Sequence, residues 1–437
     1  MQSKHLRPKD LFTPKGSLRG NHAKLFSGRA SIVVDAVEAI EVPGASAIIY
    51  GDRGVGKSSF AWQLFEILER NKEVYQQYPE LGDLDNEYVC LWIECEKRYQ
   101  NVAGVLLSLL RETVGKRGRT IKDVFPHIFD HGSSDKVQRA YEFNIGIAKA
   151  KISVDPSLEK KSDLSKVLDK ALQAQAAQIQ SEARKRSGNK ELIIFIDEFD
   201  RLPDKEGMGD FVKHFGDARV VIIGVAETAN ELLGQHPSSA RKFTGSEIEV
   251  LPLEPIEVKN IFRKASQIVE SDGRYCSLIF SDDFLNLAVE ASGGYPAIAQ
   301  FLGYHAVRNS KALERAVEQD VVVGIEEYHA ACKSIFATTG SRGRPELNAA
   351  LRDGIGKSHR RAAILDSLAD FEAGWVKTNK LRDALEKDDQ EKFSSNIRKL
   401  VEAYVLTSSV NKDKVKFTTP VLRLITRLAR EANVLYQ

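Results

Sequence analysis

The stretch GDRGVGKSSF, Gly51 to Phe60, decides the fold. It fits the pattern G-x-x-x-x-G-K-[ST], with Gly51, Gly56, Lys57 and Ser58 at the fixed positions. Glycines at these places let backbone N–H groups turn toward phosphate oxygens, and a following helix adds the partial positive charge of its N-terminus. Lys57 would reach the β- and γ-phosphates, and the Ser58 hydroxyl would ligate Mg²⁺. The stretch predicts a phosphate loop.

The flanks of this loop supply the context that the motif needs. The apolar run Ala47 to Tyr50 predicts a buried strand before it. After it, apolar residues at i, i+3, i+4 and i+7 predict a helix that begins near Lys57; they are Ala61, Leu64, Phe65 and Leu68. A strand, a glycine loop and a helix in this order favour a phosphate loop over a plain glycine-rich turn.

Four more apolar runs predict strands, and helical periodicity separates several of them. The runs are YVCLWIE, ELIIFIDEFDRL, ARVVIIGVAE and SEIEVLPL, beginning at residues 88, 191, 218 and 246. Strands that alternate with helices predict an α/β fold with a doubly wound, mainly parallel sheet. Ligands then bind at the carboxyl ends of the strands, where Gly51, Asp197 and Glu227 fall.

The run ending in Asp197-Glu198 supplies the carboxylates that a nucleoside triphosphatase needs at the tip of a neighbouring strand. Asp197 is the predicted Mg²⁺ partner of Ser58, and Glu198 is the predicted base for the attacking water. A solvated acidic turn is the alternative. Lys57 and Asp197 lie 140 positions apart, so an insertion is expected at about residues 116–190.

Composition and charge exclude several other classes of protein. The 437 residues are 42% hydrophobic and 28% charged, and they suffice for two or three domains. No apolar run approaches the ~18 residues of a membrane span, and the N-terminus has no apolar signal core. We therefore expect a cytoplasmic protein without membrane contact. The four cysteines lack ligand spacing and are expected to be reduced, buried thiols.

In their order, these stretches resemble the AAA+ ATPases, and more narrowly the branch joining replication initiators, STAND signalling ATPases and bacterial transposition-regulator ATPases. The matching segments are FSGRASIV, GDRGVGKSS, IIFIDEFD, VVIIGVAE, HPSSARK and SGGYPAIAQFLG. The resemblance covers residues 26 to about 305. It implies a nucleotide-binding core (26–253) and a helical lid (254–335). The excess of Lys and Arg before the core predicts a basic N-terminal arm (1–25), and a disordered basic tail is the alternative. The implied cofactors are ATP and Mg²⁺.

The resemblance also implies further nucleotide-binding residues on the adenine side, in the loop, at the sensor-1 strand and in the lid. The full set is Gly28, Arg29, Gly51, Gly54, Val55, Gly56, Lys57, Ser58, Ser59, Glu227, Thr228 and Pro296. This chain departs from the family twice. Sensor 1 is usually Asn or Thr, and here Glu227 and Thr228 both remain candidates. Tyr295-Pro296 replaces the initiators' sensor-2 arginine, which is similar to the STAND lid and favours a switch over a fast motor; an ordinary helix–helix turn is the alternative.

The segment HPSSARKF, 236–243, lies where AAA+ relatives place an arginine that completes the neighbouring subunit's site. Arg241 is the predicted finger, since its planar fork can hold two phosphate oxygens. A surface arginine that caps the next strand is the alternative. The finger implies an ATP-dependent homo-oligomer.

The C-terminal region predicts a linker (336–358) and then a winged helix-turn-helix (359–437). Apolar spacing marks three short helices, and two β-like segments follow around a turn at Asn411 to Asp413. Residues 391–430 hold nine Lys/Arg against three Asp/Glu, a net +6. The predicted contacts with double-stranded DNA are Lys392, Ser395, Arg398, Lys399, Lys412, Lys414 and Lys416. Docking of a protein is the alternative.

These patterns predict a slow ATPase whose nucleotide state governs DNA binding or assembly with a separate effector, as in bacterial defence or mobile-element systems. A STAND-like sensor of a protein trigger, whose winged helix serves only for docking, is the runner-up. A scaffold without ATPase activity is disfavoured by the intact Lys57, Asp197 and Glu198.

Overall fold

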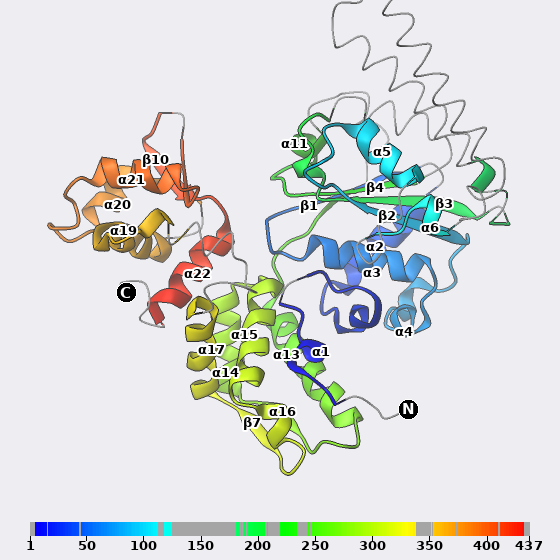
Figure 1. Cartoon of the computed structure of the whole chain (residues 1–437), viewed down its shortest axis with the longest axis horizontal. Helices are drawn as coiled ribbons and strands as arrows, with labels where there is room; N and C mark the ends of the chain where they lie inside the picture. Colours follow the sequence, from blue (N-terminus) through cyan, green and yellow to red (C-terminus); the bar gives the residue numbers. More distant parts are fainter. Residues whose placement is uncertain are drawn as a thin grey trace, which may run out of the picture. The chain divides into compact units, whose positions relative to one another are not determined.

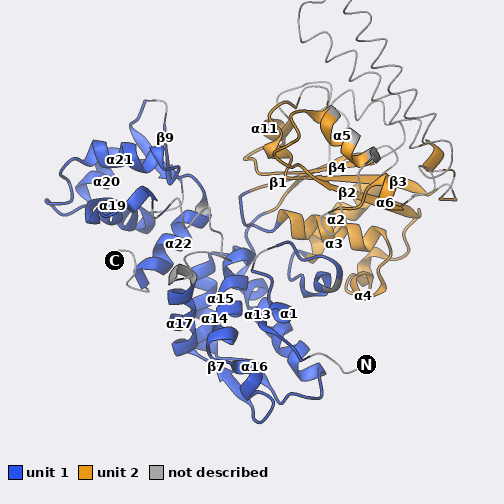
Figure 2. Ribbon diagram, in the orientation of Figure 1, with its two compact units in different colours: residues 1–29, 52–56, 251–437 blue, residues 30–51, 57–250 orange. Residues whose placement is uncertain are grey.

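The computed structural model describes residues 5–14, 16–42, 45–111, 118–124, 181–183, 185, 187–188, 190–205, 208, 219–233, 243, 246–337, 351, 353–371, 374–409 and 411–431. The chain divides into two compact units (Figure 2). Unit 1 comprises residues 1–29, 52–56 and 251–437, and unit 2 comprises residues 30–51 and 57–250. The chain therefore passes from unit 2 into unit 1 and back within the phosphate loop itself.

Unit 2 is built on a five-stranded parallel sheet in the order β2-β3-β4-β1-β5. The strands are β1 Ala47–Tyr50, β2 Tyr88–Glu94, β3 Glu191–Asp197, β4 Arg219–Ile223 and β5 Glu247–Glu249. The predicted α/β class is confirmed, and each of the five predicted strands forms. Strands β1 to β4 are buried nearly throughout. Because both faces of such a parallel strand are covered, its sequence is a continuous apolar run.

Helices cover both faces of this sheet, with α2 and α3 on one face and α5 and α11 on the other (Figure 1). Their bounds are α2 Ala30–Glu41, α3 Lys57–Leu68, α5 Val102–Arg111 and α11 Ala229–Leu233. Short helices complete the described part of unit 2; they are α4 Lys72–Tyr75, η2 Pro79–Leu81, α6 Ile121–Val124 and η4 Phe199–Arg201. Helix α3 begins at Lys57, where the periodicity predicts its start.

The order of the strands corrects one sequence-based expectation. The strand that carries Asp197, β3, is not the neighbour of β1, because β4 lies between them and pairs with both. The carboxylate of Asp197 and the loop that follows β1 therefore lie on either side of the end of β4.

The first part of unit 1 is a helical domain around α13 to α17. Its elements are α13 Pro255–Ser271, β6 Leu278–Phe280, α14 Asp282–Ser292, α15 Pro296–Asn309, α16 Ala312–Arg315, β7 Val321–Val323 and α17 Ile325–Ala337. Gly293 ends α14 in the left-handed conformation (φ 51°), as helix C-termini favour. Gly294 follows at φ 80°, and a Cβ atom there would lie 2.5 Å from the carbonyl oxygen of Leu253.

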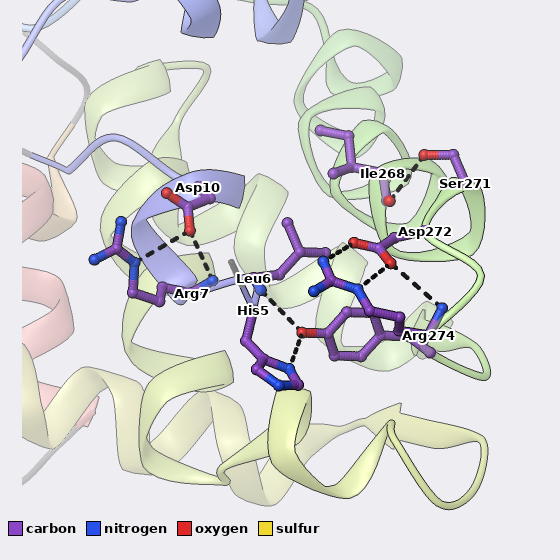
Figure 3. Close-up of polar contacts among 9 residues, drawn as sticks. His5, Leu6, Arg7, Asp10, Ile268, Ser271, Asp272 and Arg274 are labelled. Carbon is purple, nitrogen blue, oxygen red and sulfur yellow. Dashed lines mark hydrogen bonds and ion pairs between the residues drawn. The ribbon is translucent and has the colours of Figure 1, made fainter. Parts of the chain in front are cut away.

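The N-terminal segment packs into this helical domain. It contains α1 Pro8–Leu11 and η1 Gly20–Leu25. Phe12 is fully buried beside the rings of Phe262 and Phe280. The Leu6 N–H donates to the Tyr275 hydroxyl at 2.9 Å, and Asp10 caps α1 by accepting from the Arg7 N–H at 2.8 Å (Figure 3). Apolar residues within a basic segment thus tie it to the fold.

The end of unit 1, residues 359–431, is called the C-terminal module below. Its elements are α19 His359–Asp370, β8 Val376–Lys377, α20 Thr378–Asp383, α21 Phe393–Glu402, β9 Leu406–Ser408, β10 Lys414–Phe417 and α22 Pro420–Glu431. The strands form an antiparallel sheet in the order β8-β10-β9. The three predicted helices and the predicted hairpin form; β8 was not predicted. Tyr328 of α17 donates to Glu431 of α22 at 2.7 Å.

Among the described residues, no helix has the length and apolar character to cross a membrane. All four cysteines are free thiols, and three are buried; the expectation of burial is wrong for Cys276, which is exposed.

Candidate functional site

The backbone of the phosphate loop adopts the conformations that its glycines permit. Gly51, Gly54 and Gly56 have φ angles of 139°, 91° and 101°, which side chains disfavour. At Gly51 a Cβ atom would also lie 2.6 Å from the carbonyl oxygen of Val250. The loop therefore needs glycine for conformation at three positions and for space at the first.

In unit 2, the residues after the loop bring a cation and a hydroxyl to the carboxyl edge of the sheet. Lys57 is only 7% exposed, and its ammonium donates to the carbonyl oxygen of Gly51 at 3.0 Å. The Ser58 hydroxyl donates to Asp197 Oδ1 at 3.2 Å. Ser59 lies beside them in the first turn of α3. The structure thus places Ser58 and Asp197, the two residues predicted to hold Mg²⁺, within hydrogen-bonding distance of each other.

Asp197 has the surroundings of a carboxylate that meets a cation. It is the last residue of β3 and is 4% exposed. Burial raises its pKa to about 7, against hydrogen bonds from Ser58 and from the Glu198 N–H at 2.8 Å that favour the ionised form. Mg²⁺ prefers hard oxygen ligands and retains several waters, so one carboxylate and one hydroxyl beside a phosphate site suit it. The donor set fits the ion that the sequence predicts.

Glu198 follows in an unusual backbone conformation. Its φ of 55° places it in the left-handed region, which few residues with side chains adopt and which often marks functional positions. Its carboxylate forms an ion pair with Arg201 of η4. The structure thus holds Glu198 at the tip of β3, with its carboxylate directed to Arg201.

The two sensor-1 candidates lie after β4, at the start of α11. The Thr228 hydroxyl accepts from the Glu231 N–H at 3.2 Å, and the Glu231 carboxylate accepts from the Glu227 N–H at 2.8 Å. Together these bonds satisfy backbone N–H groups at the start of the helix. Ala226 forms a bridge with Gly51, which ties this turn to the start of the loop.

Unit 1 contains a separate group of residues around Arg29, which the resemblance assigns to the adenine side. Gly28 and Arg29 both have positive φ, 78° and 60°. A Cβ atom at Gly28 would lie 2.5 Å from the Glu257 side chain, which occupies that space. One Glu257 oxygen accepts from the Arg29 N–H at 2.6 Å, and the other caps α13 through the Glu254 N–H at 2.9 Å.

The Arg29 side chain forms a hydrogen bond with the middle of the phosphate loop. It is buried, and its guanidinium donates to the carbonyl oxygens of Val55 at 2.8 Å and Leu251 at 2.6 Å. Burial lowers the pKa of Arg29 to about 10, opposed by the charge of Glu257, so it stays cationic at neutral pH. A Cβ atom at Gly56 would lie 3.3 Å from its Nη1 and 3.5 Å from Pro296 Cγ. The structure thus brings Arg29, Val55, Gly56 and Pro296 together.

Sequence reasoning missed two partners of this group. Tyr295 donates its hydroxyl to Asp52 Oδ2 at 2.7 Å, which fixes a loop residue to the start of α15. Glu257 orders Gly28 and Arg29 from α13. The Tyr295–Asp52 pair spans 243 positions, and no local pattern signals such a bond. Arg241, the predicted finger, lies outside the described residues.

The predicted DNA contacts lie on α21 and around β10. Helix α21 buries Phe393, Ile397 and Leu400. Its opposite side exposes Arg398 and Lys399, and Arg398 pairs with Glu402 at 3.6 Å. The remaining positions are exposed or partly buried; they are Lys392, Ser395, Lys412, Lys414 and Lys416.

No protein-family model and no curated protein matches the chain. Among solved structures it is similar to the Aeropyrum pernix ORC1 protein in complex with DNA, with 15% identity, 98% of each chain covered and a TM-score of 0.47. It is similar to the ORC2 protein of the same organism in ADPNP–ADP complexes, with 11% identity, 98% coverage of each chain and a TM-score of 0.45. The Thermotoga maritima RuvB Holliday junction branch migration motor matches 90% of this chain and 92% of its own, with 13% identity and a TM-score of 0.39. These values are low, so the function proposed below rests on this chain's own residues.

Proposed function

We propose that the chain is a nucleotide switch of the AAA+ type, which binds ATP with Mg²⁺, hydrolyses it slowly and thereby controls binding to double-stranded DNA. The observation that carries the nucleotide half is the hydrogen bond from Ser58 to the buried Asp197, at the edge of a parallel sheet and directly after a glycine loop. A hydroxyl and a carboxylate at this edge are the pair that a phosphate-bound Mg²⁺ uses.

Each residue of this site has a distinct role in the proposal. Lys57 leaves the Gly51 carbonyl to pair with the β- and γ-phosphates, and the N-terminus of α3 adds its partial positive charge. Mg²⁺, when bound, neutralises charge that develops on the transferred phosphoryl group. Glu198 orients the attacking water and accepts its proton. Because its carboxylate pairs with Arg201, Glu198 must first exchange this partner, which supports slow turnover.

The DNA half rests on the C-terminal module. Its order of helix, strand, two helices and two strands supports the proposed winged helix, and its exposed α21 face carries Arg398 and Lys399. Assembly with a separate effector in a defence or mobile-element system, and a cytoplasmic location, remain predictions from the sequence. The protein-docking alternative is decided by the same DNA experiment.

The test measures fluorescent ATP binding, ATP turnover and duplex-DNA binding on one set of variants. Lys57→Ala removes the cation that pairs with the phosphates, so nucleotide binding should be lost, whereas Lys72→Ala, at an exposed position of α4, should bind normally. Glu198→Gln should bind ATP and turn it over at least about 100-fold more slowly. Equal turnover in Glu198→Gln and the unaltered protein would contradict the site.

DNA binding is then compared with ATP, with ADP and without nucleotide. Arg398→Glu combined with Lys399→Glu should weaken binding to every duplex sequence and leave ATP turnover unchanged. A protein that binds no duplex at low salt in any nucleotide state favours the docking alternative.

A further inference from the structure

The C-terminal module exposes a tryptophan beside a lysine. Trp375, directly before β8, is 46% exposed, and the Lys416 ammonium lies 4.9 Å from the centre of its ring. The chain has three tryptophans, and the other two, Trp62 and Trp92, stack on one another inside unit 2 and are 8% and 0% exposed. Tryptophan carries a large apolar ring and is enriched where proteins bind partners.

The register of the sheet places this ring on a basic face. Lys414 of β10 lies opposite Lys377 of β8, and the next pair, Val415 and Val376, is buried on the other side. Because strand side chains alternate, Trp375 and Lys377 share a face with Lys414 and Lys416. These four residues are called the tryptophan–lysine face.

This face places like charges together. Lysines directly opposite one another in antiparallel strands repel. Asp413 beside them has its pKa lowered, first by a hydrogen bond from Ser409 and then by the charges of Lys414 and Lys377. Lys377 and Lys414 therefore bring two like charges together on this face, and an anionic partner would relieve their repulsion.

The combination of lysines and an exposed ring selects among anionic partners. Phosphates satisfy the lysines, and a nucleobase offers a flat ring on which tryptophan can stack. Bases inside a duplex have both of their faces covered by neighbours, so their stacking on Trp375 would require unstacking. A strand with unpaired bases presents these faces without that cost.

We propose that the tryptophan–lysine face binds unpaired nucleotides of a DNA strand, with one base stacked on Trp375 and its phosphates on Lys377 and Lys414. This inference rests on the proposed DNA binding and adds an unpaired strand to the DNA that the protein recognises. The module would then bind a junction, with the duplex on α21 and the unpaired strand on β8 and β10.

The experiment uses the full chain, a labelled duplex and the same duplex with an oligo(dT) overhang. Since Trp62 and Trp92 are buried, iodide quenching of tryptophan emission reports chiefly on Trp375. The overhang should tighten binding at least about fivefold, in the range of one stacked base, and should protect the emission from iodide. The plain duplex should give neither effect.

Variants separate the parts of the face. Trp375→Leu should bind the overhang substrate like the plain duplex. Lys377→Gln with Lys414→Gln should lower the salt dependence of overhang binding by about 1.4 in log–log slope, at ~0.7 per phosphate contact. Lys387→Gln, in an exposed turn of the same module, is the matched control and should leave it unchanged.

The outcomes distinguish this inference from the proposed function. If the protein binds the duplex but the overhang neither increases the affinity nor protects tryptophan emission from iodide, the inference is overturned and the proposed DNA binding stands. Loss of all DNA binding overturns both. Tighter binding of an oligo(U) overhang than of oligo(dT) overturns the assignment to DNA and points to RNA. Because iodide protection is read on the unaltered protein, a misfolded variant does not affect this result.

Discussion

His305 shows how one buried side chain makes the stability of unit 1 depend on pH. It lies on α15, 6% exposed, with its ring near those of Phe301 and Tyr304. Burial, and then the charge of Arg308, lower its pKa to about 4 from an ordinary 6.5. The folded protein therefore keeps this imidazole neutral where the unfolded chain takes up a proton.

Below pH 6.5 protons bind the unfolded chain preferentially, so His305 should reduce stability progressively as pH falls from about 6.5 to 4. We expect its share of this loss to be on the order of 2 kcal/mol, and His305→Phe should remove it. Urea unfolding at pH 7 and pH 4.5 measures the difference. The control is His329→Gln, at an exposed position on α17, which should lose as much stability between pH 7 and pH 4.5 as the unaltered protein. If His305→Phe loses that much as well, the role given to His305 is contradicted.

At the scale of elements, the sequence predicts what local patterns determine. The apolar runs specify β1 to β5, and the glycine motif with its following periodicity places the start of α3 at Lys57. Ser58 becomes a candidate through the glycine motif, and Asp197 and Glu198 become candidates because they stand at the end of such a run. Strand order is not local, so the position of β4 between β1 and β3 could not be predicted. The two-residue β8 is too short to show periodicity.

The bond between α15 and the phosphate loop is likewise long-range, and it makes a prediction. Burial and the neighbouring Asp52 raise the pKa of Tyr295, so its phenol remains a donor at neutral pH. Tyr295→Phe removes this one bond and should weaken nucleotide binding two- to tenfold, equivalent to about 0.5–1.5 kcal/mol. Titration with fluorescent ATP measures this, and Tyr304→Phe in the same helix is the control. Equal affinities for all three proteins would show that the bond does not hold the loop for nucleotide.

At the scale of the whole molecule, the predicted finger at Arg241 would make ATP turnover a property of an assembly. A cation that reaches a neighbour's γ-phosphate can raise turnover by about 10³ or more. ATP should then drive self-association, and turnover per subunit should rise with protein concentration. Arg241→Ala should bind ATP and lose turnover, and mixing it with Lys57→Ala should restore part of it, because each variant damages a different half of the shared site. Sedimentation with ATP and the concentration dependence of turnover measure both effects; a monomer with a constant rate would exclude the finger.

The route of the chain also decides which fragments of this protein can be informative. Residues 52–56 belong with 1–29 and 251–437, whereas Gly51 and Lys57 belong with the sheet. A gene truncated to residues 30–250 would encode the whole glycine motif but would delete Arg29, Tyr295 and Pro296. The carbonyl oxygen of Val55 would lose its donor Arg29, and the carboxylate of Asp52 would lose its donor Tyr295. Gly56 would lose its neighbour Pro296. Deletion mapping would then report no ATP binding for a fragment whose motif is intact, so activity is properly assigned only with all 437 residues present.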